Sequence, residues 1–311
     1  MSSPLGRELL TVLAQISVDL SAGTALVAVR KVREDDPRQL RRLLAVAIYE
    51  EFHAGVTGPL PRTRDAAFER ILTQSIPHKD YRLPVRVCPS RDGTAAGQET
   101  VLVEHDELRI RVPANRIRET AYAPGDLVTL QTSALRPALT SGYMTVHGSH
   151  GSPADAVHVP VYVHLANSHS AADAWARVLE FLEVSRACYR AKILDHPAAY
   201  PRRNGLIISL HREDETSLRA LTGLLRNVAG IAGPTSPFAR RIGDGIAVGV
   251  VPEDPRPAIG RLTFGQHRAT ALAAAVIAAA RTEHDPHTRI ATELRSAGID
   301  PSAPSYNSAM H

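Results

Sequence analysis

The sequence predicts an α+β fold, in which N-terminal helices are followed by antiparallel strands and then by a half that alternates strands and helices. Apolar residues recur at helical spacing over much of the first 75 residues. From about residue 83 to residue 146 they instead occupy every second position of short segments, as in strands. From about residue 159 to residue 295, apolar runs of strand length alternate with helical patterns. The 311 residues suffice for two lobes or for one large domain.

The N-terminal part is predicted to be mainly helical. Apolar spacing predicts a first helix over residues 5–20, and the valine-rich residues 26–32 are expected to form a short strand. A second helix should begin after Asp36, which suits an N-cap, with Pro37 in its first turn. A third helix is expected over residues 63–75.

The middle of the chain is predicted to consist of strands separated by polar turns. Two-residue alternation predicts strands at residues 85–87, 101–103, 108–112, 127–130 and 143–146. Asp106-Glu107 is expected to turn a hairpin. The small, polar stretch Gly148–Pro153 is interpreted as either a linker between lobes or a mobile loop of an active site.

The second half is predicted to alternate strand and helix. The expected strands cover residues 159–165, 189–194, 205–210 and 245–251, of which the last two are apolar enough to be buried on both faces. The expected helices begin at Ser170 and cover residues 213–227, 266–281 and a last short stretch to Arg295. Residues 1–150 and 151–298 would be two halves that complete one domain, and residues 299–311 a flexible tail.

Composition and missing motifs exclude several classes of protein. The hydrophobic share of 44% and charged share of 22% are those of a folded globular chain. We expect a cytoplasmic protein, because there is no membrane-length apolar run, no signal peptide pattern and no disulfide framework. Phosphate-loop, dinucleotide, nucleophile-elbow and metal-spacing motifs are missing, so no cofactor and no metal are expected. Nucleic-acid and membrane partners are disfavoured as well.

Lysine is scarce in a chain that is basic overall. The net charge is +4, and Lys31, Lys79 and Lys192 are the only lysines among 36 basic residues. Lys192 lies in a predicted strand on the same face as Arg190. A neighbouring positive charge and partial burial favour the neutral form of a lysine, which suits a base that removes a proton next to a carbonyl. The alternative interpretation is an ordinary solvated lysine on an edge strand.

Other candidates for a functional site lie at the ends of predicted elements. Tyr49 and His53 share one face of the second helix, where His53 is either a proton donor or a structural residue. Arginines precede two buried strands, and a histidine-arginine pair stands in the first turn of a helix, where anions bind. These residues are Arg202, Arg203, Arg241, His267 and Arg268. A weaker candidate is the region of Ser141-Gly142-Tyr143 with His147.

Several pieces of the chain together resemble the HopA effector-like family. These pieces are Tyr49-Glu50-Glu51-Phe52-His53, Ser141-Gly142-Tyr143, Tyr189–Lys192, Tyr200–Leu210, Thr235-Ser236-Pro237-Phe238 running into Gly245-Ile246-Ala247-Val248, and Phe264-Gly265-Gln266-His267-Arg268. The resemblance covers roughly residues 40–285. The family was first known from effectors of type III secretion. Some actinomycete members are lyases in the biosynthesis of class V lanthipeptides and thioamide-containing peptides.

The resemblance implies a phosphoserine/phosphothreonine lyase. A kinase-like partner would phosphorylate a ribosomal precursor peptide, and this protein would eliminate the phosphate by β-elimination to give dehydroalanine or dehydrobutyrine. Lys192, His53 and Tyr189 would be the catalytic residues, with Lys192 as the base and His53 as the first choice of proton donor. The residues that would bind the substrate phosphate are Arg190, Arg202, Arg203, Arg241, His267 and Arg268.

An alternative hypothesis is a non-catalytic scaffold that binds the peptide or the kinase of the same pathway. In a scaffold the basic side chains would form a docking surface and need not meet. In a lyase, Lys192 and at least two of the candidate arginines would converge on one pocket. The three-dimensional arrangement of these residues therefore distinguishes the two hypotheses.

Overall fold

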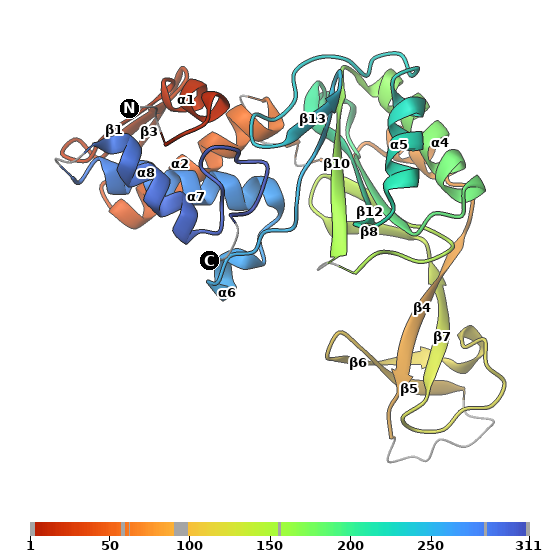
Figure 1. The fold of residues 1–311 in the computed structure, drawn as a ribbon. Helices are drawn as coiled ribbons and strands as arrows, with labels where there is room; N and C mark the ends of the chain where they lie inside the picture. The colour runs from red at the N-terminus through yellow and green to blue at the C-terminus, as the bar shows by residue number, and fades with distance from the viewer. Residues whose placement is uncertain are drawn as a thin grey trace.

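The computed structural model describes residues 4–56, 60–61, 63–89, 99–154, 157–282 and 285–308. It has an α+β fold, as the sequence predicts, with three sheets and helices on either side of the largest sheet (Figure 1). Every strand pairing between named strands is antiparallel. No helix in these ranges is both long enough and apolar enough to cross a membrane.

The largest sheet has seven strands in the order β13-β14-β10-β12-β11-β9-β8. Their bounds are β8 Leu135–Thr140, β9 Tyr143–His147, β10 His158–Leu165, β11 Tyr189–Leu194, β12 Arg202–His211, β13 Arg240–Gly243 and β14 Ile246–Val248. Helices α4 (Ser168–Val184) and α5 (Glu215–Leu225) cover one face through a core of apolar side chains (Figure 1). The predicted strands of the second half are therefore confirmed, except that β14 covers only Ile246–Val248 of the predicted residues 245–251. Strand β12 lies between two neighbours, as its apolar run indicates.

A helical lobe packs on part of the other face of this sheet. Its elements are α1 Arg7–Leu13, β1 Ile16–Asp19, β2 Thr24–Val27, β3 Arg30–Arg33, α2 Pro37–Ile48, η1 Tyr49–Ala54, α6 Pro257–Gly260, α7 Phe264–Ala279 and α8 Pro286–Ser296. Asp36 caps α2 by accepting a hydrogen bond from the Arg38 backbone N–H, as predicted. The predicted first helix is too long, because residues 16–19 pair with β2 instead of continuing α1.

The core of the helical lobe combines both ends of the chain. Side chains of α1 and α2 pack against those of α7 and α8, and Tyr162 and Ala247 of the seven-stranded sheet join the same core. The residues before and after position 150 thus share one apolar core. Sequence patterns do not show this, because helical periodicity identifies a buried face without naming its partner.

The end of the chain is packed against this lobe over the described residues. Ile299 is buried and pairs with Asn307 across an isolated bridge, and the Gly6 backbone N–H donates to the Pro301 carbonyl at 2.9 Å. The segment expected to be a flexible tail is therefore folded over residues 299–308, and residues 309–311 lie outside the described ranges.

A four-stranded sheet projects from the body of the molecule like an arm (Figure 1). It follows helix α3 (Ala66–Gln74), and its strands have the order β6-β5-β4-β7. The bounds are β4 Asp80–Val87, β5 Thr100–His105, β6 Leu108–Pro113 and β7 Leu127–Ser133, with a short helix η2 at Ala114–Arg116. The predicted Asp106-Glu107 turn joins β5 to β6, with both residues at positive φ.

Candidate functional site

Lys192 lies in the middle of β11, on the face of the sheet that points away from α4. Its register partners are Thr145 on β9 and Ile207 on β12, so all three share that face. The Lys192 Nζ donates a hydrogen bond to Thr140 Oγ1 at 3.0 Å. Arg190 lies two residues earlier on the same face, as the sequence predicts, and both side chains are half-buried.

Tyr189 points to the opposite face of β11. It is fully buried in the core beneath α4, and its ring lies edge-on to His78 with the centroids 6.5 Å apart. Burial and the nearby Glu183 carboxylate raise the pKa of the Tyr189 phenol. The structure therefore separates Tyr189 from Lys192, because successive residues of a strand face opposite sides.

Arg202 is a buried cation at the start of β12. Only 5% of its surface is exposed, yet its guanidinium makes no hydrogen bond or ion pair with any part of the chain that the structure describes. A buried charge without a partner is costly, and buried polar groups of folded proteins are nearly always paired. Arg202 therefore has the property expected of an anion-binding residue that meets its partner only when a ligand is present.

The half-buried Tyr49 and the buried Tyr143 lie within electrostatic range of Arg202. The Tyr49 hydroxyl accepts a hydrogen bond from Asn204 Nδ2 at 3.0 Å, and the Tyr143 hydroxyl donates to the Asn204 carbonyl at 3.1 Å. Burial raises the pKa of both phenols, and the positive charge of Arg202 counteracts this only in part. Both hydroxyls are consequently protonated at neutral pH and can act as hydrogen-bond donors.

Arg203 holds the end of η1 against the sheet. Its guanidinium donates to the backbone carbonyls of Glu51 and Phe52 at 3.2 Å and 2.6 Å. Gly55 ends the helix at a φ of 73°, and a Cβ at that position would lie 2.7 Å from Arg203 Nε. Of the two neighbouring arginines, Arg203 therefore closes a helix end and Arg202 remains available to a ligand.

His53 is buried in η1 between three other elements. Its Nδ1 lies 3.0 Å from Ser236 Oγ, and its ring packs edge-on against Tyr162 with centroids 4.8 Å apart. Burial and the charges of Arg203 and Arg202 lower the pKa of His53 to about 3. The ring is therefore neutral at physiological pH, so it cannot supply a proton as an imidazolium acid.

His267 and Arg268 serve the packing of the C-terminal segment. Arg268 is 2% exposed and donates to the carbonyls of Pro304 and Tyr306 and to Asn307 Oδ1, at 2.9, 3.2 and 2.9 Å. His267 Nε2 lies 3.1 Å from Asp254 Oδ2. Because their polar atoms are already engaged within the protein, neither side chain is placed to receive a substrate phosphate.

Arg241 lies away from this group of residues. It is on the edge strand β13, its side chain is 62% exposed, and it forms an ion pair with Asp244 at 2.7 Å. The structure thus places Arg202 within electrostatic range of Tyr49 and Tyr143, puts Lys192 on the same face of the sheet as Tyr143, and leaves Arg241 outside this group. We call Lys192, Arg202, Tyr49, Tyr143 and Asn204 the basic cluster.

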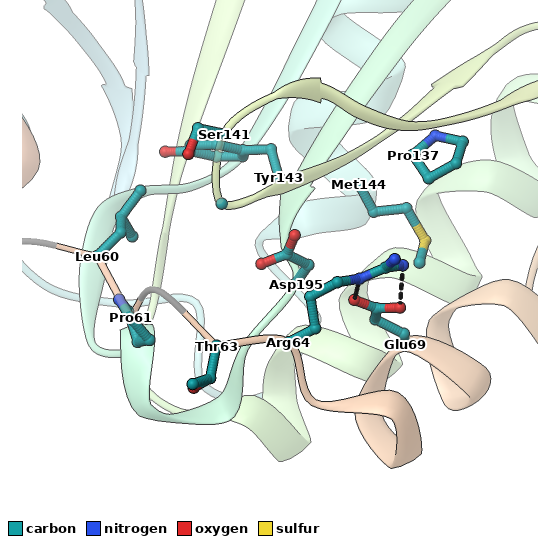
Figure 2. A pocket seen from close by; sticks show the side chains of 11 residues that line it. Leu60, Pro61, Thr63, Arg64, Glu69, Pro137, Ser141, Tyr143, Met144 and Asp195 are labelled. Atoms are coloured by element: carbon teal, nitrogen blue, oxygen red, sulfur yellow. Dashed lines mark hydrogen bonds and ion pairs between the residues drawn. The ribbon is translucent and has the colours of Figure 1, made fainter.

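A pocket shares Tyr143 with the basic cluster (Figure 2). It has a volume of about 440 Å³ and lies among the start of α3, the turn between β8 and β9, and the end of β11. Its lining residues are Leu60, Pro61, Thr63, Arg64, Glu69, Pro137, Ser141, Gly142, Tyr143, Met144 and Asp195. In the described ranges, no group of three or more His, Cys, Asp or Glu side chains has the arrangement of a metal site.

Sequence reasoning gave several members of this site too little weight or missed them. Tyr143 belongs to a motif that ranks as a weak candidate, and Asn204 lies in the resembling piece Tyr200–Leu210 without a role of its own, while Thr140 and Asp195 carry no sequence signal. Asn204 and Asp195 each lie within two residues of a named candidate or strand end. Their importance comes from the pairing of β11 with β9 and β12, which single-sequence periodicity does not specify.

Comparison with solved structures finds proteins that resemble the chain. Two solved structures resemble it with a TM-score of 0.49 each. One is the effector protein from Pseudomonas syringae pv. tomato strain DC3000, at 13% identity over 89% of this chain and 92% of that one. The other is the effector protein from Pseudomonas syringae pv. syringae strain 61, at 11% identity over 88% and 94% of the two chains.

Among curated proteins no sequence matches the chain. The family model described as the HopA1 effector protein family matches residues 134–306, which is more than half of the chain. This match begins just before β8 and contains the seven-stranded sheet, α7 and α8, whereas the arm and most of the helical lobe precede it. The chain therefore belongs to the HopA1 effector protein family.

Proposed function

We propose that this protein is a carbon–oxygen lyase that eliminates phosphate from phosphoserine or phosphothreonine residues of a ribosomal precursor peptide, as in lanthipeptide or thioamitide maturation. The products are dehydroalanine or dehydrobutyrine in the peptide and inorganic phosphate. The reaction class comes from the family resemblance, and the arrangement of the basic cluster supports it.

The observation that carries the proposal is the unpaired, buried guanidinium of Arg202 within electrostatic range of Tyr143. Tyr143 connects Arg202 to Lys192, because it pairs with Leu194 on the face of the sheet that carries Lys192 and lies within electrostatic range of Arg202. A phosphate bound by Arg202 would thus hold the Cα–H of its own residue on the side where Lys192 lies. An enzyme of this kind needs a base and an anion site close together.

In the proposed reaction, the neutral amine of Lys192 takes the Cα proton. The electron pair of the Cα–H bond forms the Cα=Cβ double bond, and the Cβ–O bond breaks with its electrons remaining on the departing phosphate. Arg202 offsets the charge that develops on the phosphate, and Tyr49 donates a hydrogen bond to it. The Lys192 ammonium afterwards returns its proton to water, so the protein is regenerated.

Two residues shape the cluster without contacting substrate. Asn204 holds the Tyr49 hydroxyl through its side chain and the Tyr143 hydroxyl through its backbone carbonyl. His53 is a positioning residue, because its neutral ring fills the space between Tyr49 and Tyr162 and carries no charge that would compete for phosphate. The proposal therefore assigns the leaving-group interactions to a phenol and an arginine instead of a histidine.

The test is mass spectrometry of a phosphothreonine peptide incubated with the purified protein, without nucleotide or metal. Loss of the mass of phosphoric acid from the peptide, with release of inorganic phosphate, is the expected result. The peptide should also be tested together with its kinase-like partner and leader sequence. An intact phosphopeptide under all of these conditions would contradict the lyase and favour the scaffold that binds the peptide or kinase.

A further inference from the structure

The pocket beside the basic cluster has an electrostatic character opposite to that of the cluster. Figure 2 shows the Asp195 carboxylate between the β8–β9 turn and the ion pair of Arg64 with Glu69. Arg64 donates to both carboxylate oxygens of Glu69, at 2.6 and 2.5 Å, so these two charges compensate each other. Among the lining residues that the structure describes, Asp195 therefore carries the charge that is left after this ion pair.

Asp195 forms no ion pair in the described part of the chain, although the charge of Arg64 lies within electrostatic range of its carboxylate. Apart from an interaction with its own backbone N–H, its side-chain oxygens form no hydrogen bond and no ion pair with the residues that the structure describes, although the side chain is half-buried. Burial and the nearby Glu69 raise the pKa of Asp195, as expected of a carboxylate whose charge is poorly compensated. A ligand cation in the pocket would offset both the cost of burying the Asp195 charge and its repulsion by Glu69.

The walls of the pocket suit a long side chain with a charged end. Leu60, Pro61, Pro137, Met144 and the ring of Tyr143 provide apolar surface around Asp195. Lysine and arginine bury their methylene stems along such surfaces while their charged groups reach a polar partner. The volume of about 440 Å³ accommodates one such side chain with part of its backbone.

The position of the pocket relative to Lys192 determines how many peptide residues would separate the phosphorylated residue from the one in the pocket. Asp195 follows directly after β11, and its backbone N–H donates to the Gly142 carbonyl at 3.2 Å, which extends the β9–β11 ladder. Three strand residues from Lys192 to Asp195 span about 10 Å, which equals about three residues of an extended peptide. A peptide whose phosphorylated residue lies at the basic cluster would therefore place a residue about three positions away in the pocket.

We propose that this pocket is a substrate subsite for a lysine or arginine side chain located about three residues from the phosphorylated residue. This inference rests on the proposed lyase function and adds a rule about the substrate. The peptide is then recognised by charges of both signs, with its phosphate at Arg202 and its basic side chain at Asp195. Tyr143 lies between the two subsites.

The test compares phosphothreonine peptides that differ at a single position, with lysine, glutamine or glutamate placed two, three or four residues to either side of the phosphothreonine. We expect kcat/KM for one lysine peptide to exceed that of its glutamine counterpart by about tenfold, mostly through KM. Asp195→Asn should remove this preference, and Asp195→Lys should transfer it to the glutamate peptide. Arg241→Gln, at an exposed residue on a different edge of the sheet, is the control and should leave the preference unchanged.

Two outcomes separate this inference from the function on which it rests. If all peptides are processed at equal rates by the wild-type protein and by Asp195→Lys, the lyase stands and the subsite is wrong. If no peptide is processed, peptide binding measured by fluorescence anisotropy still tests the pocket, since Asp195→Lys should reverse the charge preference of binding. Equal affinity for all peptides in that measurement would overturn the subsite as well.

Discussion

At the scale of single residues, the molecule contains two buried arginines in opposite situations. Arg268 donates to three acceptors of the C-terminal segment and lies over the Phe264 ring, whereas Arg202 has no acceptor in the described residues. A paired buried charge stabilises the fold that surrounds it, and an unpaired one costs free energy. The contrast separates a structural arginine from one that is kept for binding.

This contrast predicts opposite effects of the same substitution. Arg202→Met should leave the free energy of unfolding unchanged or raise it, and should lower phosphate elimination by ~10²- to 10³-fold, the effect of losing one preorganised charge. Arg268→Met should destabilise the fold by about 3 kcal/mol or more, because it leaves buried carbonyls without donors. Urea unfolding and peptide mass spectrometry measure the two effects. Unimpaired elimination by Arg202→Met would remove this residue from the site.

Substitution of Lys192 tests directly whether its amine is the general base. Lys192→Arg keeps the positive charge but offers no group that can be deprotonated near neutral pH. We expect elimination to fall by ~10²- to 10⁴-fold, the usual contribution of a general base, with phosphopeptide binding largely retained. Lys31→Arg, at an exposed residue of β3, is the matched control and should behave as wild type. Retained turnover in Lys192→Arg would exclude this amine as the base.

At the scale of elements, the site depends on how closely α7 approaches η1. Gly265, in the first turn of α7, lies so near His53 that a Cβ there would be 2.2 Å from the imidazole Cδ2. The Thr263 and Gln266 side chains and backbone form a capping box that starts α7 at this point. The histidine of one motif and the glycine of another, separated by more than 200 residues, are thus parts of one contact.

Gly265→Ala should therefore destabilise the protein although alanine is the better helix former. We expect a loss of ~1–3 kcal/mol from overpacking, together with reduced elimination because His53 and Tyr49 are displaced. Gly223→Ala is the matched control, since a Cβ at this exposed position of α5 has open space, and it should stabilise by ~0.5–1 kcal/mol. Chemical denaturation measures the free energy of unfolding of both variants. A more stable Gly265→Ala protein would contradict the close contact between Gly265 and His53.

At the scale of the whole molecule, buried neutral histidines make stability depend on pH. The pKa of His53 in the folded protein is about 3, and that of His267 is lowered to about 4, chiefly by burial. An unfolded histidine has a pKa of ~6.5, so below that pH the unfolded chain binds protons that the folded chain does not. The stabilisation that comes from keeping these histidines neutral is therefore complete above pH ~6.5, and it is lost as the pH falls toward 4.

The expected result is a free energy of unfolding that decreases as the pH is lowered from about 6.5 to 4, by up to ~1.4 kcal/mol per pH unit for each such histidine. His53→Gln should make this decrease shallower, whatever its effect on stability at pH 7. His169→Gln, at an exposed histidine, should leave the slope unchanged. Urea titrations at a series of pH values supply the slopes, and equal slopes in all three proteins would contradict the buried neutral state of His53.

The sequence by itself determined the fold class, most strands and helices of the second half, the α2 cap and the family resemblance. These features depend on local chemistry, since apolar periodicity, capping residues and turn residues act within a few positions of one another. Lys192 and Arg190 were predictable as same-face neighbours for the same reason. A family motif likewise identified Arg202 and Arg203 as a pair, but it did not assign a separate role to each.

Only the tertiary structure decided which residues meet. Strand pairing brings Thr140 into hydrogen-bond contact with Lys192 and puts Tyr143 on the same face of the sheet. The packing of η1 on the sheet engages Arg203 and leaves Arg202 without a partner among the described residues. Burial makes His53 neutral, and the folded C-terminal segment occupies Arg268. Burial, charge compensation and pairing register are properties of contacts between distant segments, and periodicity in one chain does not specify them.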